Sequence, residues 1–257
     1  FCCKNNLFLL TSSDIITTSC GWSVITVRIS GLQKLSMVDY PGKLAATVFT
    51  GGCDLRCPFC HNAPLVVRVA ETPHLSQEEI LSFLDSRRGL LDGVVLSGGE
   101  PLLQPDAAEF LRAVRSMGFA VKLDTNGCHP EALADILRQG LADYVAMDIK
   151  NCREKYAGTV GVPDFDLAPV EESIQLLCRS GVEFEFRTTV VREFHTAADI
   201  TAIGRWLEGS PQYFLQKFVD SGDLVGSGCH APEDEEMRAM AEAARPWFQA
   251  VALRGID

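Results

Sequence analysis

The chain has 257 residues and a formal net charge of −11, with 47% hydrophobic and 22% charged residues. This composition is typical of a globular protein and excludes a disordered chain, a collagen-like repeat and a coiled coil. No apolar run approaches the roughly 20 residues that span a bilayer. The acidic balance also argues against a general nucleic-acid binder, because phosphate contacts need clustered Lys and Arg. We therefore expect neither a membrane nor a nucleic acid as partner.

The first segment of the chain, residues 1–26, has no hydrophobic period. It is not a convincing signal peptide, because its apolar run, Leu7 to Leu10, is short and no small-residue cleavage site follows. We expect residues 1–26 to be a poorly ordered N-terminal tail, as an over-extended start would produce. Residues 27–257 are expected to form one domain.

Short apolar runs then alternate with segments of helical period, which predicts a series of strand–helix units. The predicted strands are 45–50, 93–97, 120–124, 144–148, 183–190 and 213–218, and a last helix is predicted at 233–244. Crossover helices require parallel strands. We predict an α/β fold, a partial (β/α)6 barrel of parallel strands with outer helices. Ligands of such folds lie at the carboxyl ends of the strands, so the chemistry is expected just after each strand.

The loop after the first of these strands carries Cys53, Cys57 and Cys60, with the spacing C-x3-C-x2-C. Tight clustering favours a metal or redox site in a reducing compartment, and we expect a cytoplasmic protein. A four-iron cluster normally takes four thiolates, so three would leave one iron free to bind a substrate or cofactor. The alternatives are three buried cysteines, or a zinc knuckle completed by His61.

The cysteine spacing, with Phe59 before the last cysteine, resembles the hallmark of the radical S-adenosylmethionine (SAM) enzymes. Within that group the chain is similar to the glycyl-radical-enzyme activating enzymes, because GLQ at 31–33, VDYPGK at 38–43 and HN at 61–62 are typical of them. The branch that it resembles is the anaerobic ribonucleoside-triphosphate reductase activating proteins. The resemblance extends to about Val225.

The resemblance implies a [4Fe-4S] cluster on the three cysteines and a radical SAM oxidoreductase activity. The reduced cluster would cleave SAM to methionine and a 5′-deoxyadenosyl radical. That radical would take a hydrogen atom from a glycine of a partner glycyl radical enzyme. The implied electron donor is a reduced flavodoxin- or ferredoxin-type protein.

The second predicted strand ends in Ser97, Gly98, Gly99 and Glu100, followed by proline. Two glycines let the backbone approach a ligand closely, and the resemblance implies that this edge binds the amino group of SAM. Without the cysteine motif the same residues would be a tight turn before a helix. Glu100 is expected to support the loop rather than to act in acid–base catalysis.

Charged residues end or follow two further strands, at Asp124, Asp148 and Lys150, and Arg187 lies within the predicted strand 183–190. By resemblance Asp148 and Lys150 bind SAM, and Asp124 with Asp148 forms a candidate monovalent-cation site. Arg187 is a candidate contact to the carboxylate or ribose of SAM, because a buried charge needs a partner. The alternatives are that Asp124 caps a turn and that Arg187 forms a surface salt bridge.

A further group of residues is assigned a secondary role in the pocket. These are His195, a loop histidine or site residue, Gln216, Lys217 and Phe218 as pocket lining, Tyr40 and Lys43 as neighbours of the cluster, and Cys128 and Cys152 near the mouth. Cys178 is predicted to be a small core residue of a helix.

Two other functions remain open at this point. A radical SAM enzyme acting on a small molecule predicts a closed, small pocket, whereas a protein substrate predicts an open groove. A non-enzymatic iron–sulfur or zinc module predicts a fourth protein ligand and no SAM pocket.

Overall fold

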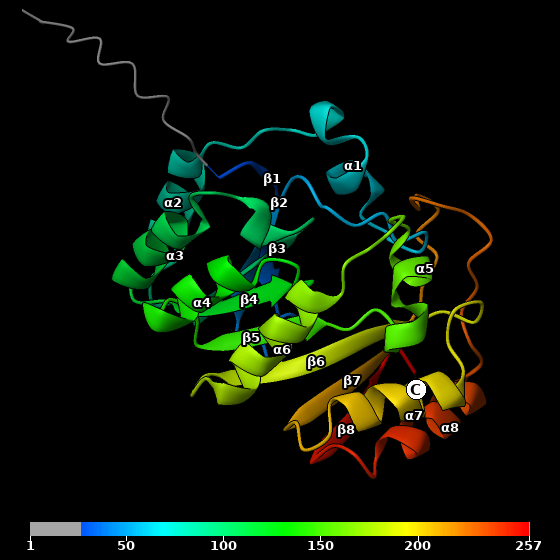
Figure 1. Ribbon diagram of the computed structural model, residues 1–257. Coiled ribbons are helices and arrows are strands. Elements are labelled where there is room, and N and C mark those ends of the chain that lie inside the picture. The colour runs from blue at the N-terminus through cyan, green and yellow to red at the C-terminus, as the bar shows by residue number, and fades with distance from the viewer. Residues whose placement is uncertain (1–26, 257) are drawn as a thin grey trace, which may run out of the picture.

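The computed structural model describes residues 27–256, which form one β-sheet surrounded by helices (Figure 1). The sheet has eight strands in chain order. Their bounds are β1 Ile29–Ser36, β2 Ala45–Thr50, β3 Gly93–Gly98, β4 Ala120–Thr125, β5 Tyr144–Asp148, β6 Glu183–Val190, β7 Gln212–Lys217 and β8 Ala250–Arg254. β1 pairs with β2 in antiparallel orientation, and the other neighbouring strands pair in parallel. The expected tail, residues 1–26, lies outside the described residues.

Helices connect most of the parallel strands, as parallel pairing requires. The α-helices are α1 Ala63–Val66, α2 Gln77–Asp85, α3 Ala107–Ser116, α4 Pro130–Arg138, α5 Tyr156–Val160, α6 Ala168–Arg179, α7 Ala197–Trp206 and α8 Asp234–Ala244. Three short 3-10 turns are η1 Val69–Glu71, η2 Pro101–Leu103 and η3 Arg153–Lys155. Along the sheet, α2 packs against α3, α4 against α6 and α7 against α8 (Figure 1). Among residues 27–256 there is no helix with the length and hydropathy needed to cross a membrane.

The predicted α/β fold is confirmed, and β2 to β7 lie where the six strands were expected. The expectation of six strands was incomplete, because β1 and β8 extend the sheet at its two edges. β1 has three consecutive exposed residues, and β8 has only five residues without a buried one. The sequence of β1, ISGLQKLS, has neither a strict alternation nor an apolar run, whereas β8 has an apolar run of four residues, Ala250 to Leu253, which is the shortest that indicates a strand. Within the described residues the sheet ends at β1 and β8, so the barrel stays open between them.

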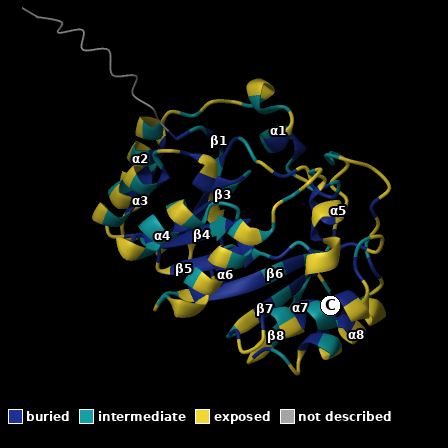
Figure 2. Ribbon diagram, viewed as in Figure 1, coloured by how far each residue is buried: buried dark blue, intermediate teal, exposed yellow. Residues whose placement is uncertain are grey.

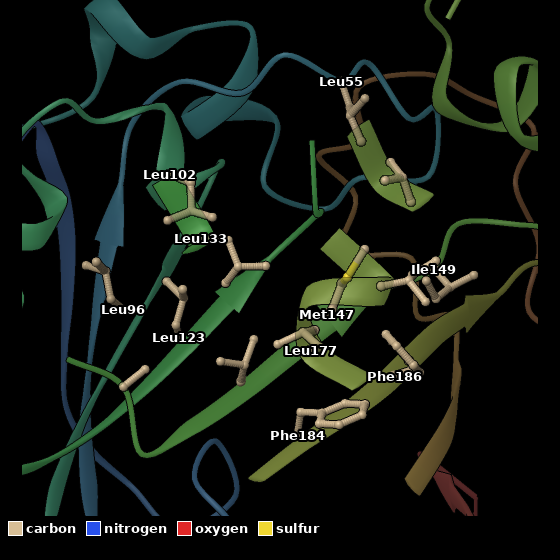
Figure 3. Packing of buried hydrophobic residues seen from close by; sticks show 14 of the residues in the cluster. Leu55, Leu96, Leu102, Leu123, Leu133, Met147, Ile149, Leu177, Phe184 and Phe186 are labelled. Atoms are coloured by element: carbon tan, nitrogen blue, oxygen red, sulfur yellow. The ribbon is translucent and has the colours of Figure 1, made fainter. Parts of the chain in front are cut away.

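The core lies between the sheet and its helices. Successive residues of a strand face opposite sides, and the side chains of Leu96, Leu123 and Met147 face the helices and are buried. Leu133 of α4 and Leu177 of α6 belong to the same cluster (Figure 3). Figure 2 shows the consequence: the strands are buried, and the exposed residues lie on the outward surfaces of the helices and in loops. The opposite face of the sheet carries polar side chains and forms the site described below.

Cys178 corrects the prediction of a core cysteine, because it is exposed on α6. The buried residues of this helix are Val170, Ser173, Ile174 and Leu177. They follow a 3.6-residue period, and Cys178 lies about 100° beyond Leu177 around the helix axis. The prediction placed the apolar stripe one residue too far along the chain.

Candidate active site

A cavity of about 380 Å³ lies on the polar face of the sheet, at the carboxyl ends of the parallel strands. The predicted site residues that line it are Cys53, Cys57, Phe59, Cys60, Ser97, Gly98, Gly99, Asp124, Asp148, Lys150 and Arg187. The structure thus brings together residues from the loop after β2 and from the ends of β3, β4, β5 and β6. Glu100 is the predicted site residue that does not line the cavity.

The cysteine loop between β2 and α1 is held by backbone hydrogen bonds to distant segments. The amide of Arg56 donates to the carbonyl of Val160 at the end of α5, over 2.9 Å. The amide of Gly226, in the connection between β7 and α8, donates to the carbonyl of Pro58 over 2.8 Å. A Cβ atom at Gly226 would lie 2.7 Å from Pro58, so the approach requires glycine. The three cysteines are therefore positioned by the folded chain and not by their loop alone.

Phe59 is buried and contacts the segment that follows β6. Its ring packs against Phe194 at 5.6 Å and against His195 at 6.5 Å, measured between ring centroids. This contact anchors the loop between Cys57 and Cys60, which explains why an aromatic residue is useful at that position.

The thiols of the cysteine loop are in an environment that disfavours a free thiolate. Burial raises the pKa of Cys53 to about 12 and that of Cys57 to about 11. A bound metal supplies the positive charge that stabilises thiolates, and its binding releases the thiol protons. Cys53 and Cys57 are thus neutral thiols without a metal and are suited to binding a positively charged metal group.

The type of metal group follows from how the thiols are arranged. No trio of His, Cys, Asp or Glu side chains within residues 27–256 surrounds a single-ion site. Cys53, Cys57 and Cys60 instead line one wall of a shared cavity. A four-iron cluster is bound by thiolates through separate iron atoms, so these residues fit it better than they fit one zinc ion.

The glycines after β3 lie against the start of the cysteine loop. Gly98 has a φ of +122°, and a Cβ atom there would lie 2.3 Å from the amide nitrogen of Thr50. A Cβ atom at Gly99 would lie 1.9 Å from the carbonyl oxygen of Gly52. Both positions therefore need glycine. The backbone of Ser97, Gly98 and Gly99 forms the edge of the cavity beside the sulfur atoms.

Glu100 lies behind this edge and is fully buried. Its carboxylate accepts hydrogen bonds from the amide of Leu102 (3.0 Å), the hydroxyl of Thr125 (2.8 Å) and the amide of Asn126 (2.7 Å). Burial raises its pKa to about 7, although these hydrogen bonds favour the charged form. Glu100 thus joins the loop after β3 to the end of β4 and the loop that follows it.

Five charged side chains form one connected network across the inner face of the sheet. Arg187 on β6 contacts two carboxylates: its Nε lies 2.9 Å from Asp148 and its Nη1 lies 3.3 Å from Asp124. Lys150 Nζ contacts Asp148 at 3.0 Å, and Lys122 Nζ contacts Asp124. The contact between Arg187 and Asp124 spans β5, which lies between their strands. The alternative of a surface salt bridge for Arg187 is excluded by these contacts.

The network keeps its two carboxylates charged. Burial alone would raise the pKa of Asp124, but Arg187 and Lys122 outweigh it and lower that pKa. Burial would likewise raise the pKa of Asp148, yet Arg187 and Lys150 hold it well below its usual range. Three cations then face two carboxylates, which leaves one positive charge in excess. Such a site suits a ligand with a carboxylate, the group that Arg and Lys bind best.

The candidate monovalent-cation site does not fit the structure. Each carboxylate oxygen of Asp124 and Asp148 accepts from a cationic side chain of this chain. Ser97 Oγ also donates to Asp124, over 3.1 Å. An added cation would have to compete with a cationic side chain at each of these four oxygens, in a network that already contains more cations than carboxylates.

His195 is buried, contacts the backbone of Lys150 and does not line the cavity. Its Nε2 lies 2.8 Å from the carbonyl oxygen of Lys150, and its Nδ1 lies 3.1 Å from the amide of Val191. Because that amide can only donate, Nδ1 is the acceptor and Nε2 carries the proton. Burial lowers the pKa of His195, so the ring is neutral.

Tyr40 and Lys43 were expected beside the cysteines, and the structure places them at the opposite end of the barrel. Tyr40 packs against Tyr144, the first residue of β5, with ring centroids 6.1 Å apart. Lys43 lies over the ring of Tyr40 at 5.6 Å. The reason is that β2 runs between Lys43 and Cys53, and so it carries the chain from the amino end of the barrel to the carboxyl end.

Of the three residues expected from β7, only Gln216 lines the cavity. Lys217 forms an ion pair with Asp234 at 2.6 Å, and Phe218 is buried in the core. Cys128 and Cys152 do not line the cavity either. The Cys152 thiol lies 3.7 Å from Asp199 at the start of α7.

The cavity also contains residues that sequence reasoning missed. Gln33 and Asp39 of the β1–β2 hairpin line it together with Thr47, and Thr47 Oγ1 donates to Asp39 over 2.7 Å. Asn126, in the loop after β4, donates to Asp54 over 2.8 Å beside Cys53. The one available signal was that Gln33 and Asp39 belong to the motifs on which the resemblance rests.

The sequence of this chain is similar to that of a known family and of several named proteins. The sequence model of the radical SAM superfamily matches residues 47–206. A protein of Methanocaldococcus jannaschii named as a putative glycyl-radical enzyme activating enzyme is 34% identical over 236 residues, which cover 89% of this chain and 96% of that protein. The pyruvate formate-lyase-activating enzyme of Clostridium pasteurianum is 36% identical over 129 residues, 48% of this chain and 52% of that protein. The chain thus spans nearly all of the first relative and about half of the second.

A solved structure agrees in fold. A domain of a pyruvate-formate lyase-activating enzyme from Bacteroides vulgatus superposes with a TM-score of 0.52 and 16% identity, over 63% of this chain and 99% of that domain.

Proposed function

The chain belongs to the radical SAM superfamily, and from this we propose that it activates a glycyl radical enzyme, with anaerobic ribonucleoside-triphosphate reductase as its partner. Residues 27–257 would form the single radical SAM domain that carries the activity. When bound, a reduced [4Fe-4S] cluster and SAM supply a carbon-centred radical that can take a hydrogen atom from a glycine Cα. Relatives of this chain are named as activating enzymes, and its similarity to them supports this class of reaction.

The residues of the cavity divide between the two cofactors. Cys53, Cys57 and Cys60 would hold the cluster and leave one iron without a side chain of this protein. Lys150 and Arg187 would face the carboxylate of SAM, since the network has one positive charge in excess. The backbone edge at Gly98 and Gly99 would face its amino group, because no side chain there blocks the approach.

One observation carries this proposal. The thiols and the positively charged network line the same cavity of about 380 Å³. A metal centre and an amino-acid carboxylate would therefore be held next to each other, as the reaction requires. A zinc module has no need for the charged network, and an electron carrier has no need for a cavity.

The opening of the barrel, together with the limited room in the cavity, supports a protein substrate. Ligand pockets usually measure roughly 300 to 1,000 Å³, so this cavity holds one cofactor-sized molecule and little else. A second reactant has to approach from outside, and the barrel is open between β1 and β8. A loop of a partner protein can enter such an opening. We extend the proposal to a reduced flavodoxin- or ferredoxin-type electron donor and to the cytoplasm, where thiols remain reduced.

Electron paramagnetic resonance on the anaerobically reconstituted protein tests the proposal. The protein is mixed with reductant, SAM and either anaerobic ribonucleoside-triphosphate reductase or pyruvate formate-lyase. A glycine-centred doublet on the reductase is expected, and none with the Cys57→Ala variant. A doublet on the lyase alone would exclude the proposed partner. Cleavage of SAM without any glycine doublet would favour a small-molecule substrate.

A further inference from the structure

Lys122 on β4 is a buried cation whose side chain touches no part of the cavity. The residue is 1% exposed and is absent from the cavity lining. Lysine is almost never fully buried unless it is paired, and the carboxylate partner of Lys122 is Asp124. Asp124, unlike Lys122, lines the cavity. Lys122 can therefore act on a ligand only through Asp124.

The charge balance of the network depends on this residue. Without Lys122, Arg187 and Lys150 would face Asp124 and Asp148, and the network would be neutral. With Lys122 the network has one positive charge in excess. Lys122 takes one oxygen of Asp124, so Asp124 engages Arg187 only through its other oxygen. Lys122 thus supplies the excess positive charge of the network from outside the cavity lining.

We propose that Lys122 is a positioning residue that serves as a built-in cation, takes the place of a monovalent metal ion beside Asp124, and makes carboxylate binding independent of potassium and sodium. The inference rests on the proposed function, because SAM is the carboxylate ligand that it concerns. It departs from the cation site that the resemblance implied, since each carboxylate oxygen of Asp124 and Asp148 already contacts a cationic side chain.

Titration of SAM into the anaerobic, cluster-loaded protein tests the inference. The titration is run in potassium, sodium and choline chloride at equal ionic strength. We expect the wild-type dissociation constant to agree within about twofold among the three salts. The Lys122→Met variant should bind at least roughly tenfold more weakly in choline chloride, about 1.4 kcal/mol, and should recover in potassium or sodium. Lys34→Met, which removes an exposed lysine of β1, should behave as the wild type.

The outcomes separate this inference from the proposed function. A wild-type protein that binds SAM only with potassium or sodium would overturn the inference and leave the function intact. A Lys122→Met variant that binds weakly in all three salts would also overturn it, because a metal ion could not replace the lysine. Absence of SAM binding in every salt would contradict the function instead, and the next measurement then decides on Lys122.

Thermal unfolding of the full chain without SAM gives that second readout. Lys122→Met should unfold roughly 2 to 4 °C lower than the wild type in choline chloride, and potassium should restore much of the loss by binding the folded state. The double variant Lys122→Met/Asp124→Asn has no unpaired carboxylate oxygen, so its midpoint should not respond to potassium. If Lys122→Met fails to fold in either salt while the double variant folds, a metal ion cannot replace Lys122 and the inference is wrong.

Discussion

The imidazole of His195 donates a hydrogen bond from Nε2 to the carbonyl oxygen of Lys150, over 2.8 Å. This contact joins the loop after β6 to the loop after β5 and holds the backbone that carries a cavity lysine. His195→Phe would leave that buried carbonyl without a donor, which costs about 1–3 kcal/mol of unfolding free energy. Urea denaturation measures the loss. His195→Gln can still donate and should retain most of the stability; equal losses in both variants would contradict the assigned role.

The same histidine predicts a pH dependence of stability. Burial lowers the pKa of the folded ring, while the unfolded chain titrates near the usual value of about 6.5. As pH falls below about 6.5, the unfolded state takes up a proton first, so the free energy of unfolding decreases. We expect the wild type to lose roughly 1 kcal/mol more than His195→Gln between pH 7 and pH 5. Parallel unfolding curves at both pH values check this; an identical pH response would show that His195 titrates normally in the fold.

Cys57 is the buried member of the cysteine loop, and its removal should prevent cluster assembly. Cys57→Ala is expected to contain little iron after anaerobic reconstitution and to lack the absorbance of an iron–sulfur cluster. Cys178→Ala is the matched control, because Cys178 is exposed on α6. Iron and sulfide analysis of both variants measures how much cluster each one contains. Full iron content in Cys57→Ala would rule out the cluster assignment.

Lys150 should act on SAM and not on the cluster. Lys150→Met removes one of the two cations that face the cavity, so we expect SAM affinity to fall at least roughly tenfold, about 1.4 kcal/mol. Iron content should be unchanged. Lys217→Met removes a lysine that pairs with Asp234 outside the cavity and should leave SAM affinity as in the wild type. Calorimetric titration on reconstituted protein compares the variants, and a loss of iron in Lys150→Met would point to a different role.

Glu100 should be needed for folding rather than for chemistry. Glu100→Ala leaves the amides of Leu102 and Asn126 without their acceptor, and we expect a loss of at least about 2 kcal/mol in the free energy of unfolding. Glu109→Ala, on the exposed side of α3, should cost little. Urea denaturation compares the two. Normal stability of Glu100→Ala together with lost activity would instead favour a catalytic role.

The residues at the ends of the parallel strands could be predicted from the sequence. Asp124 and Asp148 end neighbouring parallel strands, and such ends meet at one edge of the sheet. The cysteine motif follows β2, so the same rule places it at this edge of the sheet. In these cases chain order and strand direction are sufficient, because parallel pairing aligns the strand ends.

Other features depended on the direction of a strand or on contacts between loops. Tyr40 and Lys43 are close to Cys53 in sequence, but β2 separates them by the length of the barrel. Gln33 reaches the cavity because a hairpin folds beside it, and neither the hairpin nor its register has a signal in the period of hydrophobic residues. Lys122 and Asp124 share one face of β4 because they are two residues apart in a strand. That Lys122 is buried and that Arg187 of β6 contacts the same carboxylate depends on tertiary packing.

The hydrogen bond from Gly226 to Pro58 has a consequence for biosynthesis. The cysteine loop is among the first parts of the described chain to leave the ribosome, whereas the strand-to-helix connection that fastens it emerges late. A nascent polypeptide therefore exposes three thiols that are not yet fastened in place. We expect iron and sulfide to be delivered after translation is essentially complete, and a partly synthesised chain to be a poor acceptor for them.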